Sequence, residues 1–557
     1  MSLAVLSLAF TMILILGYHF YGRFIAKQYA LNDQNPTPAT AINDGEDFVP
    51  TKPFYLLGQH FSAIAAAGPI AGPIIACQAF GWLPCILWIG LGVIFIGAVH
   101  DFSALIASVR YQARSIAEVV KENIGKRAWI AMTAFIWLAL VYVIVAFADI
   151  TASTFVGKSE EFEGGKFFFN PGGAVAASSV LYMLLAIVMG LLQRYLKVPL
   201  WLLTVIFVPG TLGAVWLGTK VSSLLLFDQK TWGMMILAYC FVASILPVWL
   251  LLQPRGYLGG FVLYLALGIG VAGIFWGGFG IEQEAFKTWA APGTTGTLFP
   301  FLFVTIACGA CSGFHGLVCS GTTSKQISQE SHCKPVGYGG MLLEGFVALI
   351  SLATIMIVSS SETKGLSPGV IYGNGLAHFL TKMIGEEHFL FASTFGAMAF
   401  STFVFDTLDV STRLGRYVLQ ELFGLKGKQG AMIATALTLL LPAIFILLSK
   451  EGAYRLYWTL FGTSNQLLAA LTLLGITVWL YQSGKRYWFT LVPMFFVMTI
   501  TTWSLVLQIG HGARLIHERG FEFNPITINA VISVALILLA ATQCYEAGKI
   551  FFLRKKG

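Results

Sequence analysis

Residues 58–73 read GQHFSAIAAAGPIAGP and lie in a stretch, from Lys52 to Asp101, that encloses no charged side chain. A membrane helix needs roughly 20 apolar residues, so the stretch can cross a bilayer. Each proline removes a backbone donor and obstructs the carbonyl one turn earlier, whereas glycine opens the backbone without steric cost. Irregular backbone at membrane depth persists only where protein or a water-filled cavity satisfies it. An ordinary proline kink is the alternative. We predict a break at a substrate-binding site, made by Gly68, Pro69, Gly72 and Pro73.

The composition indicates that the whole chain, and not only this stretch, is suited to a membrane. Of its 557 residues, 57% are hydrophobic and 11% are charged, and the mean hydropathy is +0.77. Soluble domains are about 25% charged, and a membrane β-barrel would show short alternating segments. We therefore predict an all-α polytopic membrane protein with the lipid bilayer as its surroundings. The net charge of +8 indicates no nucleic-acid partner, because the basic residues follow the loop pattern described next.

Charged and Pro/Gly-rich breaks divide the chain into about fifteen candidate spans. Loops on one side carry about twice the Lys and Arg of loops on the other, which predicts an outer N-terminus and a cytoplasmic C-terminus. No basic residue precedes the first apolar run, so we expect a membrane span there rather than a cleavable signal. The predicted spans are 3–22, 61–79, 82–109, 129–155, 174–192, 199–219, 231–252, 257–280, 297–321, 340–360, 389–412, 431–449, 455–481, 488–509 and 526–545.

Short internal matches indicate a repeat. Residues 61–65 (FSAIA) resemble 303–307 (FVTIA), and 148–152 (ADITA) resemble 408–412 (LDVST), with a longer linker at 361–388. Seven spans in each half force opposite orientations, which is the inverted-repeat plan of secondary transporters. The predicted parts are an extra N-terminal helix (1–22), a cytoplasmic loop (23–60), a first repeat (61–280), an extracellular linker (281–296), a second repeat (297–545) and a basic cytoplasmic tail (546–557).

A second broken helix is expected at the repeat-related position. Residues 307–316 read ACGACSGFHG, and three glycines in so short a stretch lower helix propensity. Paired discontinuous helices point to a transporter's substrate site. Their free carbonyls can hold a cation, and the N–H groups of a half-helix can hold a carboxylate. The candidate substrate-binding residues here are Gly309, Ser312, Gly313 and His315.

The same segment allows a metal-site interpretation. Cys308, Cys311, His315 and Cys319 would form one stripe on a continuous helix, and thiolates and imidazole are zinc ligands. The glycines argue against a rigid helix, and small cysteines in apolar spans pack like hydrophobic residues. We expect no required cofactor, with zinc at Cys308, Cys311 and His315 as the alternative.

Acids within spans are the candidates for coupling. Membrane-embedded carboxylates cost roughly 2.5–3.5 kcal/mol on insertion scales and usually face a cavity or a partner. Asp409 and Arg413 are four residues apart, which predicts an ion pair. Asp101 has fewer obvious local partners. We predict that a coupling cation, H⁺ or Na⁺, is handled by Asp101, His100, Glu344, Asp149, Asp409, Ser411 and Thr412.

Three lesser features complete the candidates. His60, after Gln59, is expected either at the mouth of the first broken span or in a capping role. The polar stretch 463–466 (TSNQ) joins helices or lines the pathway. Motifs typical of hydrolases and ATP-driven pumps are missing from the sequence, so an enzyme is not expected.

At residues 58–73 the chain resembles the carbon starvation protein A family. Similar blocks are GAVHDF (97–102), IACGACSGFH (306–315), SGTT (320–323), TLD (407–409) with Arg413, and FGTSNQLLA (461–469). The resemblance implies a bacterial inner-membrane importer of small nutrients, with peptides and, in some members, pyruvate as substrates. It also implies a five-plus-five broken-helix core like that of LeuT and the amino acid–polyamine–organocation transporters, with extra helices. One departure is Gln59, where the family pattern is expected to read Gly-His-His.

These observations favour a cation-coupled importer of short peptides or a related small carboxylate, active during nutrient limitation. A pyruvate-specific proton symporter is one alternative. The other is a metal-binding or redox-sensing membrane protein built on Cys308, Cys311 and His315.

Overall fold

The computed structural model describes residues 2–45, 47–65, 67–157, 160–162, 167–291, 296–448 and 453–553. Within these ranges the chain is mostly helical, which confirms the all-α class. Twelve described helices are long and apolar enough to cross a membrane. A thirteenth candidate is the pair α4 (Pro53–Ile64) and α5 (Gly68–Phe80), which is bent by 48°. Residues 554–557 of the predicted tail and 292–295 of the predicted linker lie outside the described residues.

Two compact units divide the chain, and each takes segments from both predicted repeats. Unit 1 comprises Met1–Leu6, Leu140–Glu284 and Ile350–Tyr457, and unit 2 comprises Ser7–Ala139, Ala285–Leu349 and Trp458–Gly557. Helices α1 (Leu3–Leu16), α9 (Lys126–Thr154), α16 (Gly339–Met356) and α20 (Tyr454–Gln482) contribute residues to both units.

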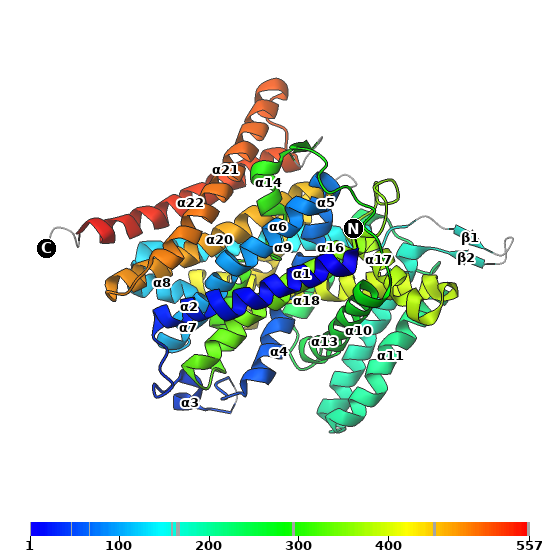
Figure 1. The fold of residues 1–557 in the computed structure, drawn as a ribbon, viewed down its shortest axis with the longest axis horizontal. Helices are drawn as coiled ribbons and strands as arrows, with labels where there is room; N and C mark the ends of the chain where they lie inside the picture. The colour runs from blue at the N-terminus through cyan, green and yellow to red at the C-terminus, as the bar shows by residue number, and fades with distance from the viewer. Residues whose placement is uncertain are drawn as a thin grey trace. The chain divides into compact units, whose positions relative to one another are not determined.

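Unit 1 is built from helices that pack in pairs. Neighbours in sequence such as α10 and α11 lie side by side (Figure 1). Its own elements are β1 (Glu160–Phe162), β2 (Phe167–Phe169), α10 (Pro171–Tyr195), α11 (Leu200–Lys220), α12 (Gln229–Ile245), α13 (Leu252–Trp276), α17 (Pro368–Ile384), the 3₁₀ turn 386–388, α18 (Phe389–Phe423) and α19 (Gly427–Leu448).

Unit 2 carries the two predicted breaks. Its elements are the π-turn 17–21, α2 (Gly22–Tyr29), α3 (Pro38–Ile42), α4, α5, α6 (Trp82–Gly92), the π-turn 93–97, α7 (Ala98–Arg110), α8 (Ile116–Asn123), β3 (Ala290–Ala291), β4 (Gly296–Thr297), α14 (Leu298–Thr305), α15 (Phe314–Gly321), the short turns 323–325, 330–332 and 334–338, α21 (Trp488–Arg519) and α22 (Pro525–Leu553).

Some predicted spans are shorter or more broken than expected. The span predicted at 231–252 is α12, which has 17 residues and ends at Ile245. Pro247 follows two residues later. The residue before a proline is disfavoured in the helical region, and Leu246 is accordingly extended. The span predicted at 297–321 consists of α14 and α15, with eight residues each.

The predicted linker 361–388 contains a helix that the sequence did not indicate, α17. The start of α17 packs against the end of α9, where Gly369 lies against Thr154. Its other end packs against the residues that follow α13, where the rings of Phe379 and Phe279 are 5.3 Å apart. With 17 residues, α17 is not among the helices long enough to be candidate membrane spans.

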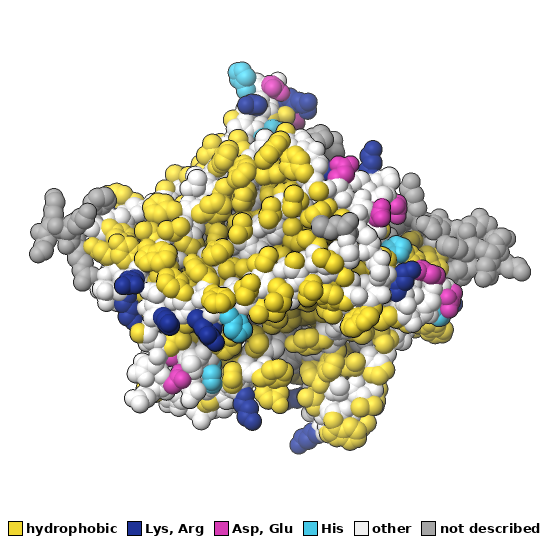
Figure 2. All heavy atoms as spheres, viewed as in Figure 1, with side chains coloured by type: hydrophobic (Ala, Val, Ile, Leu, Met, Phe, Trp, Pro, Cys, Tyr) yellow, Lys and Arg dark blue, Asp and Glu magenta, His cyan; other side chains and the backbone are white. Residues whose placement is uncertain are grey.

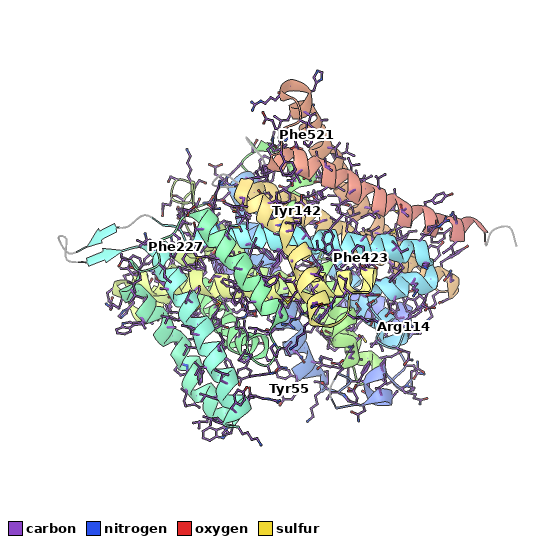
Figure 3. The ribbon with its side chains drawn as sticks, turned by 180° about the vertical axis from the view of Figure 1, so that it is seen from behind. Tyr55, Arg114, Tyr142, Phe227, Phe423 and Phe521 are labelled. Carbon is purple, nitrogen blue, oxygen red and sulfur yellow. The ribbon has the colours of Figure 1, made fainter. Side chains whose placement is uncertain are left out.

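The interior of unit 1 is closed by aromatic contacts. Tyr142 on α9 is fully buried, and its ring lies 5.5 Å from that of Phe445 on α19 (Figure 3). The ring of Phe445 in turn lies 5.1 Å from that of Tyr457. Phe227 and Phe423, at the margins of α12 and α18, are exposed instead (Figure 3).

Large apolar side chains are also exposed on the outside of the helices. Figure 2 shows hydrophobic side chains over much of the visible face, with few charged groups among them. In α11, for example, Trp201, Val205 and Trp216 are more than half exposed. Soluble monomers rarely expose large contiguous apolar patches. The surface is therefore that of a multi-pass membrane protein.

Candidate functional site

The first break lies immediately before the Gly-Pro pairs. Helix α4 ends at Ile64 and α5 begins at Gly68. Pro69 and Pro73 belong to α5 itself, so the predicted break at 68–73 is displaced toward the N-terminus. Pro69 is tolerated there because the first turn of a helix has no intrahelical partner for its N–H groups.

The second break covers eight residues of unit 2. Helix α14 ends at Thr305 and α15 begins at Phe314. Gly309, Ser312 and Gly313 lie in the segment between them, and His315 lies in the first turn of α15. This is a discontinuous helix, as the glycine spacing predicts.

The two breaks touch, and glycine is needed for the contact. A methyl group at Gly68 would overlap Sγ of Cys308, and one at Gly72 would lie 2.7 Å from the carbonyl oxygen of Thr305. There is no room for a side chain at either glycine. The glycines therefore allow the backbone of α5 to lie close to the second break. The predicted substrate-binding residues of both halves are therefore brought together within unit 2.

Helix α20 satisfies the open backbone of the second break. The backbone N–H of Gly313 donates to the Asn465 carbonyl (3.0 Å), and that of Phe314 donates to Asn465 Oδ1 (2.9 Å). Asn465 Nδ2 donates to Ser312 Oγ (3.1 Å). The polar stretch 463–466 thus joins helices. Asn465 was missing from the predicted site, although the amide in an apolar span was its signal.

Two indole groups cap the other end of the break. Trp458 Nε1 donates to the carbonyl of Thr305 (3.0 Å), and Trp88 Nε1 donates to that of Ile306 (3.1 Å). Buried backbone groups that lose helical partners must find others. The carbonyl groups at the end of α14 thus accept hydrogen bonds from side chains in place of the missing next turn of helix.

A histidine between two carboxylates lies beside the breaks. His315 Nδ1 is 2.8 Å from Asp101 Oδ2, and His315 Nε2 is 3.1 Å from Glu344 Oε2. His100 Nδ1 is 2.8 Å from the other oxygen of Asp101. All four side chains are at most 1% exposed. We call Asp101, His100, His315 and Glu344 the His–carboxylate cluster; it joins α7, α15 and α16.

The charge of this cluster depends on its protons. Two ionised acids and one imidazolium leave one negative charge, and burying an uncompensated charge is costly. One proton on Glu344, or a second on His100, removes it. The net charge of the buried cluster therefore depends on a single proton.

The residues of the alternative metal site make other contacts in the structure. Cys308 and Cys311 lie in the break rather than on α15, so the stripe is not on one continuous helix. Both ring nitrogens of His315 face carboxylates, and Cys319 Sγ donates to the backbone carbonyl of Asp101 (3.5 Å). Among the described residues, no group of three His, Cys, Asp or Glu side chains is arranged to hold a metal ion.

Unit 1 holds the other predicted acids, with different partners. Arg255 on α13 is fully buried and pairs with Asp406 and with Asp409 Oδ2, the latter at 2.9 Å. Tyr239 OH also donates to Asp409 Oδ2 (2.9 Å). The sequence did not single out Arg255 or Tyr239, because only the fold brings α12 and α13 against α18.

The expected pair of Asp409 with Arg413 is therefore wrong. Arg413 Nη2 instead donates to the carbonyls of Ala243 (2.7 Å) and Leu246 (3.0 Å), at the end of α12. A cation at the C-terminal end of a helix meets its free carbonyls and negative dipole end. This gives Arg413 a better partner than an acid one turn away.

The remaining predicted coupling residues are buried in unit 1. Gln229 Nε2 donates to Asp149 Oδ1 (2.9 Å). Ser411 and Thr412 are fully buried on α18, and Ser411 Oγ has no hydrogen-bond partner among the described residues. Asp149 and Asp409 thus belong to separate polar contacts rather than to one demonstrated cation site.

A pocket opens at the C-terminal end of α15, which is the end away from the second break. It has a volume of about 220 Å³ and is lined by Asp47, Val49, Gln59, Gly321, Thr322, Lys325 and Gln326. Lys325 Nζ lies 3.4 Å from Asp47 Oδ2. The lining is mostly polar, so the pocket suits water and small polar solutes.

Comparisons with known proteins agree with the sequence resemblance. The family described as Carbon starvation protein CstA matches residues 1–374 and 363–504. The peptide transporter CstA of Helicobacter pylori is 34% identical over 89% of this chain and 80% of its own. The peptide transporter CstA of Bacillus subtilis is 30% identical, over 97% and 95%. The pyruvate/proton symporter BtsT of Escherichia coli is 30% identical, over 89% and 80%.

Among solved structures, a manganese transporter of Eremococcus coleocola is similar at 13% identity. The match has a TM-score of 0.44 and covers 91% of this chain and 98% of that one.

Proposed function

Because the chain belongs to the carbon starvation protein CstA family, we propose that it is a secondary active transporter for short peptides or a related small carboxylate, driven by a cation gradient. Its relatives named above are transporters, and the chain is a multi-pass membrane protein. The bacterial inner membrane is the location that these relatives suggest.

The observation that carries the proposal is His315 between Asp101 and Glu344. These three titratable groups are buried directly beside the contact between the two helix breaks. We assign H⁺ rather than Na⁺ as the coupling ion, since a nitrogen ligand at the centre of the cluster suits a proton better than a hard cation that prefers oxygen.

Substrate binding is assigned to the same contact. The first turn of α5 and the start of α15 present helix N-termini, where a substrate carboxylate is stabilised. At α15 the N–H of Phe314 is already bound to Asn465. A carboxylate that arrives there must displace Asn465, so substrate binding and the closure of the second break compete.

Uptake into proteoliposomes tests the function. Labelled pyruvate and a labelled dipeptide are supplied separately, under an imposed inward gradient of H⁺ or of Na⁺. We expect accumulation of at least one substrate above empty liposomes with the proton gradient. Accumulation driven by Na⁺ alone would overturn the choice of ion, and equilibration without accumulation would overturn active transport.

An outer N-terminus and a cytoplasmic C-terminus complete the proposal. The contact of Gln482 Nε2, at the end of α20, with the carbonyl of Asn123 (3.1 Å), at the end of α8, supports it. Both helix ends adjoin loops on the basic side of the predicted topology, where the positive-inside rule expects the cytoplasm. A C-terminal green fluorescent protein fusion should fluoresce, and a C-terminal alkaline phosphatase fusion should be inactive.

A further inference from the structure

His60 follows a residue that lines the pocket, and its own side chain is buried in unit 2. Its chain neighbour Gln59 lines the pocket, whereas the His60 side chain is 1% exposed. His60 Nδ1 is 2.9 Å from Thr323 Oγ1, and Thr322, the neighbour of Thr323, lines the pocket as well. The hydroxyl that contacts this ring nitrogen of His60 therefore belongs to a buried residue that follows the pocket residue Thr322 in the chain.

The other ring nitrogen faces inward. His60 Nε2 is buried and has no hydrogen-bond partner among the described residues. The ring lies against Gly340 of α16, where a methyl group would be 2.9 Å from His60 Cδ2 and 3.5 Å from Nε2. A side chain at position 340 would therefore displace the ring, and the inward nitrogen lies over the surface of α16.

Glu344 is one turn further along the same face of α16. Residues four apart in a helix are neighbours on one face, and one turn advances about 5.4 Å. Glu344 Oε1 is also buried without a hydrogen-bond partner in the described part of the chain. Both unsatisfied atoms therefore belong to side chains over one face of α16, and buried waters bind polar groups that lack other partners.

We propose that His60 relays the coupled proton between Glu344 of the His–carboxylate cluster and the pocket. The inference rests on the proposed function and names the route that its proton takes. Glu344 gives a proton through one water to Nε2, while the proton on Nδ1 passes to Thr323 Oγ1 and the hydroxyl proton of Thr323 passes to pocket water. One proton leaves the cluster and one reaches the pocket, and rotation of the ring resets the tautomer.

The ionisable groups of the cluster lie on α7, α15 and α16, and of these elements α15 and α16 contact α4 or His60 itself. They are Asp101 and His100 on α7, His315 on α15 and Glu344 on α16. Within the described part of the chain, Glu344 is the acid of the cluster that has an oxygen without a hydrogen-bond partner, and His100 Nε2 also lacks one. The relay therefore begins at Glu344 rather than at Asp101, whose oxygens are taken by His100 and His315.

Two transport modes of the reconstituted full chain test the relay. Proton-driven accumulation needs net proton movement, whereas counterflow between equal substrate pools at equal pH does not. Labelled pyruvate and a labelled dipeptide are the probes, and a pH dye inside the vesicles reports proton entry. His60→Asn keeps a polar atom near Thr323 but carries no mobile proton. We expect it to lose accumulation and acidification and to retain counterflow.

Matched variants sharpen the result. Thr323→Val should behave like His60→Asn, whereas Thr323→Ser keeps the hydroxyl and should retain accumulation. His332→Asn is the control, because His332 contacts Ser328 (3.0 Å) away from the cluster, and it should leave both modes unchanged.

Each other outcome overturns the relay. Normal accumulation by His60→Asn would remove His60 from the proton route. Loss of counterflow as well would assign His60 to folding or to substrate binding. A wild-type protein with counterflow but no proton-driven accumulation would overturn the proposed coupling, and the relay with it.

Discussion

His315 Nδ1 and Asp101 Oδ2 are 2.8 Å apart, although 214 residues separate them in the chain. This contact joins the first turn of α15, just after the second helix break, to the first turn of α7. Any movement that changes the break must therefore alter, or work against, a buried bond between an imidazole and a carboxylate. The predictions below follow from this and three other contacts.

Asp101→Asn should abolish pH-driven uptake while the folded protein remains abundant. The amide keeps the size of the side chain but removes the charge that holds His315 and His100. Proton-driven uptake in proteoliposomes and the monodisperse yield in detergent are the measurements. Glu421→Gln, which removes an exposed acid at the end of α18, is the control. Unchanged uptake by Asp101→Asn would remove Asp101 from the mechanism.

Gly68→Ala should destabilise the protein, because the new methyl overlaps Cys308. Overpacking of this kind typically costs about 1–3 kcal/mol, which thermal unfolding in detergent can detect. Adding Cys308→Gly should restore much of the loss, since it removes the obstructing atoms. Gly213→Ala, where nothing lies within 4 Å, should be neutral or slightly stabilising. Equal stability of Gly68→Ala and wild type would show that the two breaks are not in contact.

Asn465→Ala should loosen the second break. The change leaves the N–H of Phe314 and the hydroxyl of Ser312 without their partner, at a cost of about 1–3 kcal/mol for a buried group. Both the unfolding temperature and the substrate Km should change. Gln28→Ala, which loses only a contact within its own helix, serves as the comparison. A variant with wild-type stability and Km would contradict the assigned role.

Arg255→Met should strongly lower the free energy of unfolding, through its contacts in unit 1. It leaves Asp406 and Asp409 without their buried cation, and breaking a buried pair on one side costs about 3–5 kcal/mol. The triple variant Arg255→Met, Asp406→Asn, Asp409→Asn should recover most of that stability, because no uncompensated charge remains. Lys382→Met, from an exposed pair with Glu386, should change stability by less than about 1 kcal/mol. Failure of the triple variant to recover would indicate that shape rather than charge decides this contact.

Several features could be read from local sequence. The charge-free stretches predict membrane helices, because hydrocarbon excludes charge whatever the surrounding fold. Glycine and proline predict both breaks, since they act on their own backbone; the first break was misplaced by a few residues because proline also starts helices well. Helix α17 was missed because Asn374, His378 and Lys382 interrupt its apolar residues.

The partners of the buried polar groups could not be read in this way. Local sequence shows which residues are too costly to leave in lipid: Asp101, Glu344 and Asp409 must find polar partners. The identity of those partners follows from the packing of the helices, which brings His315 to Asp101, Arg255 to Asp409 and Asn465 to Ser312. The cost of burying a charge is a property of the side chain itself, whereas its pairing depends on residues that are distant in the chain.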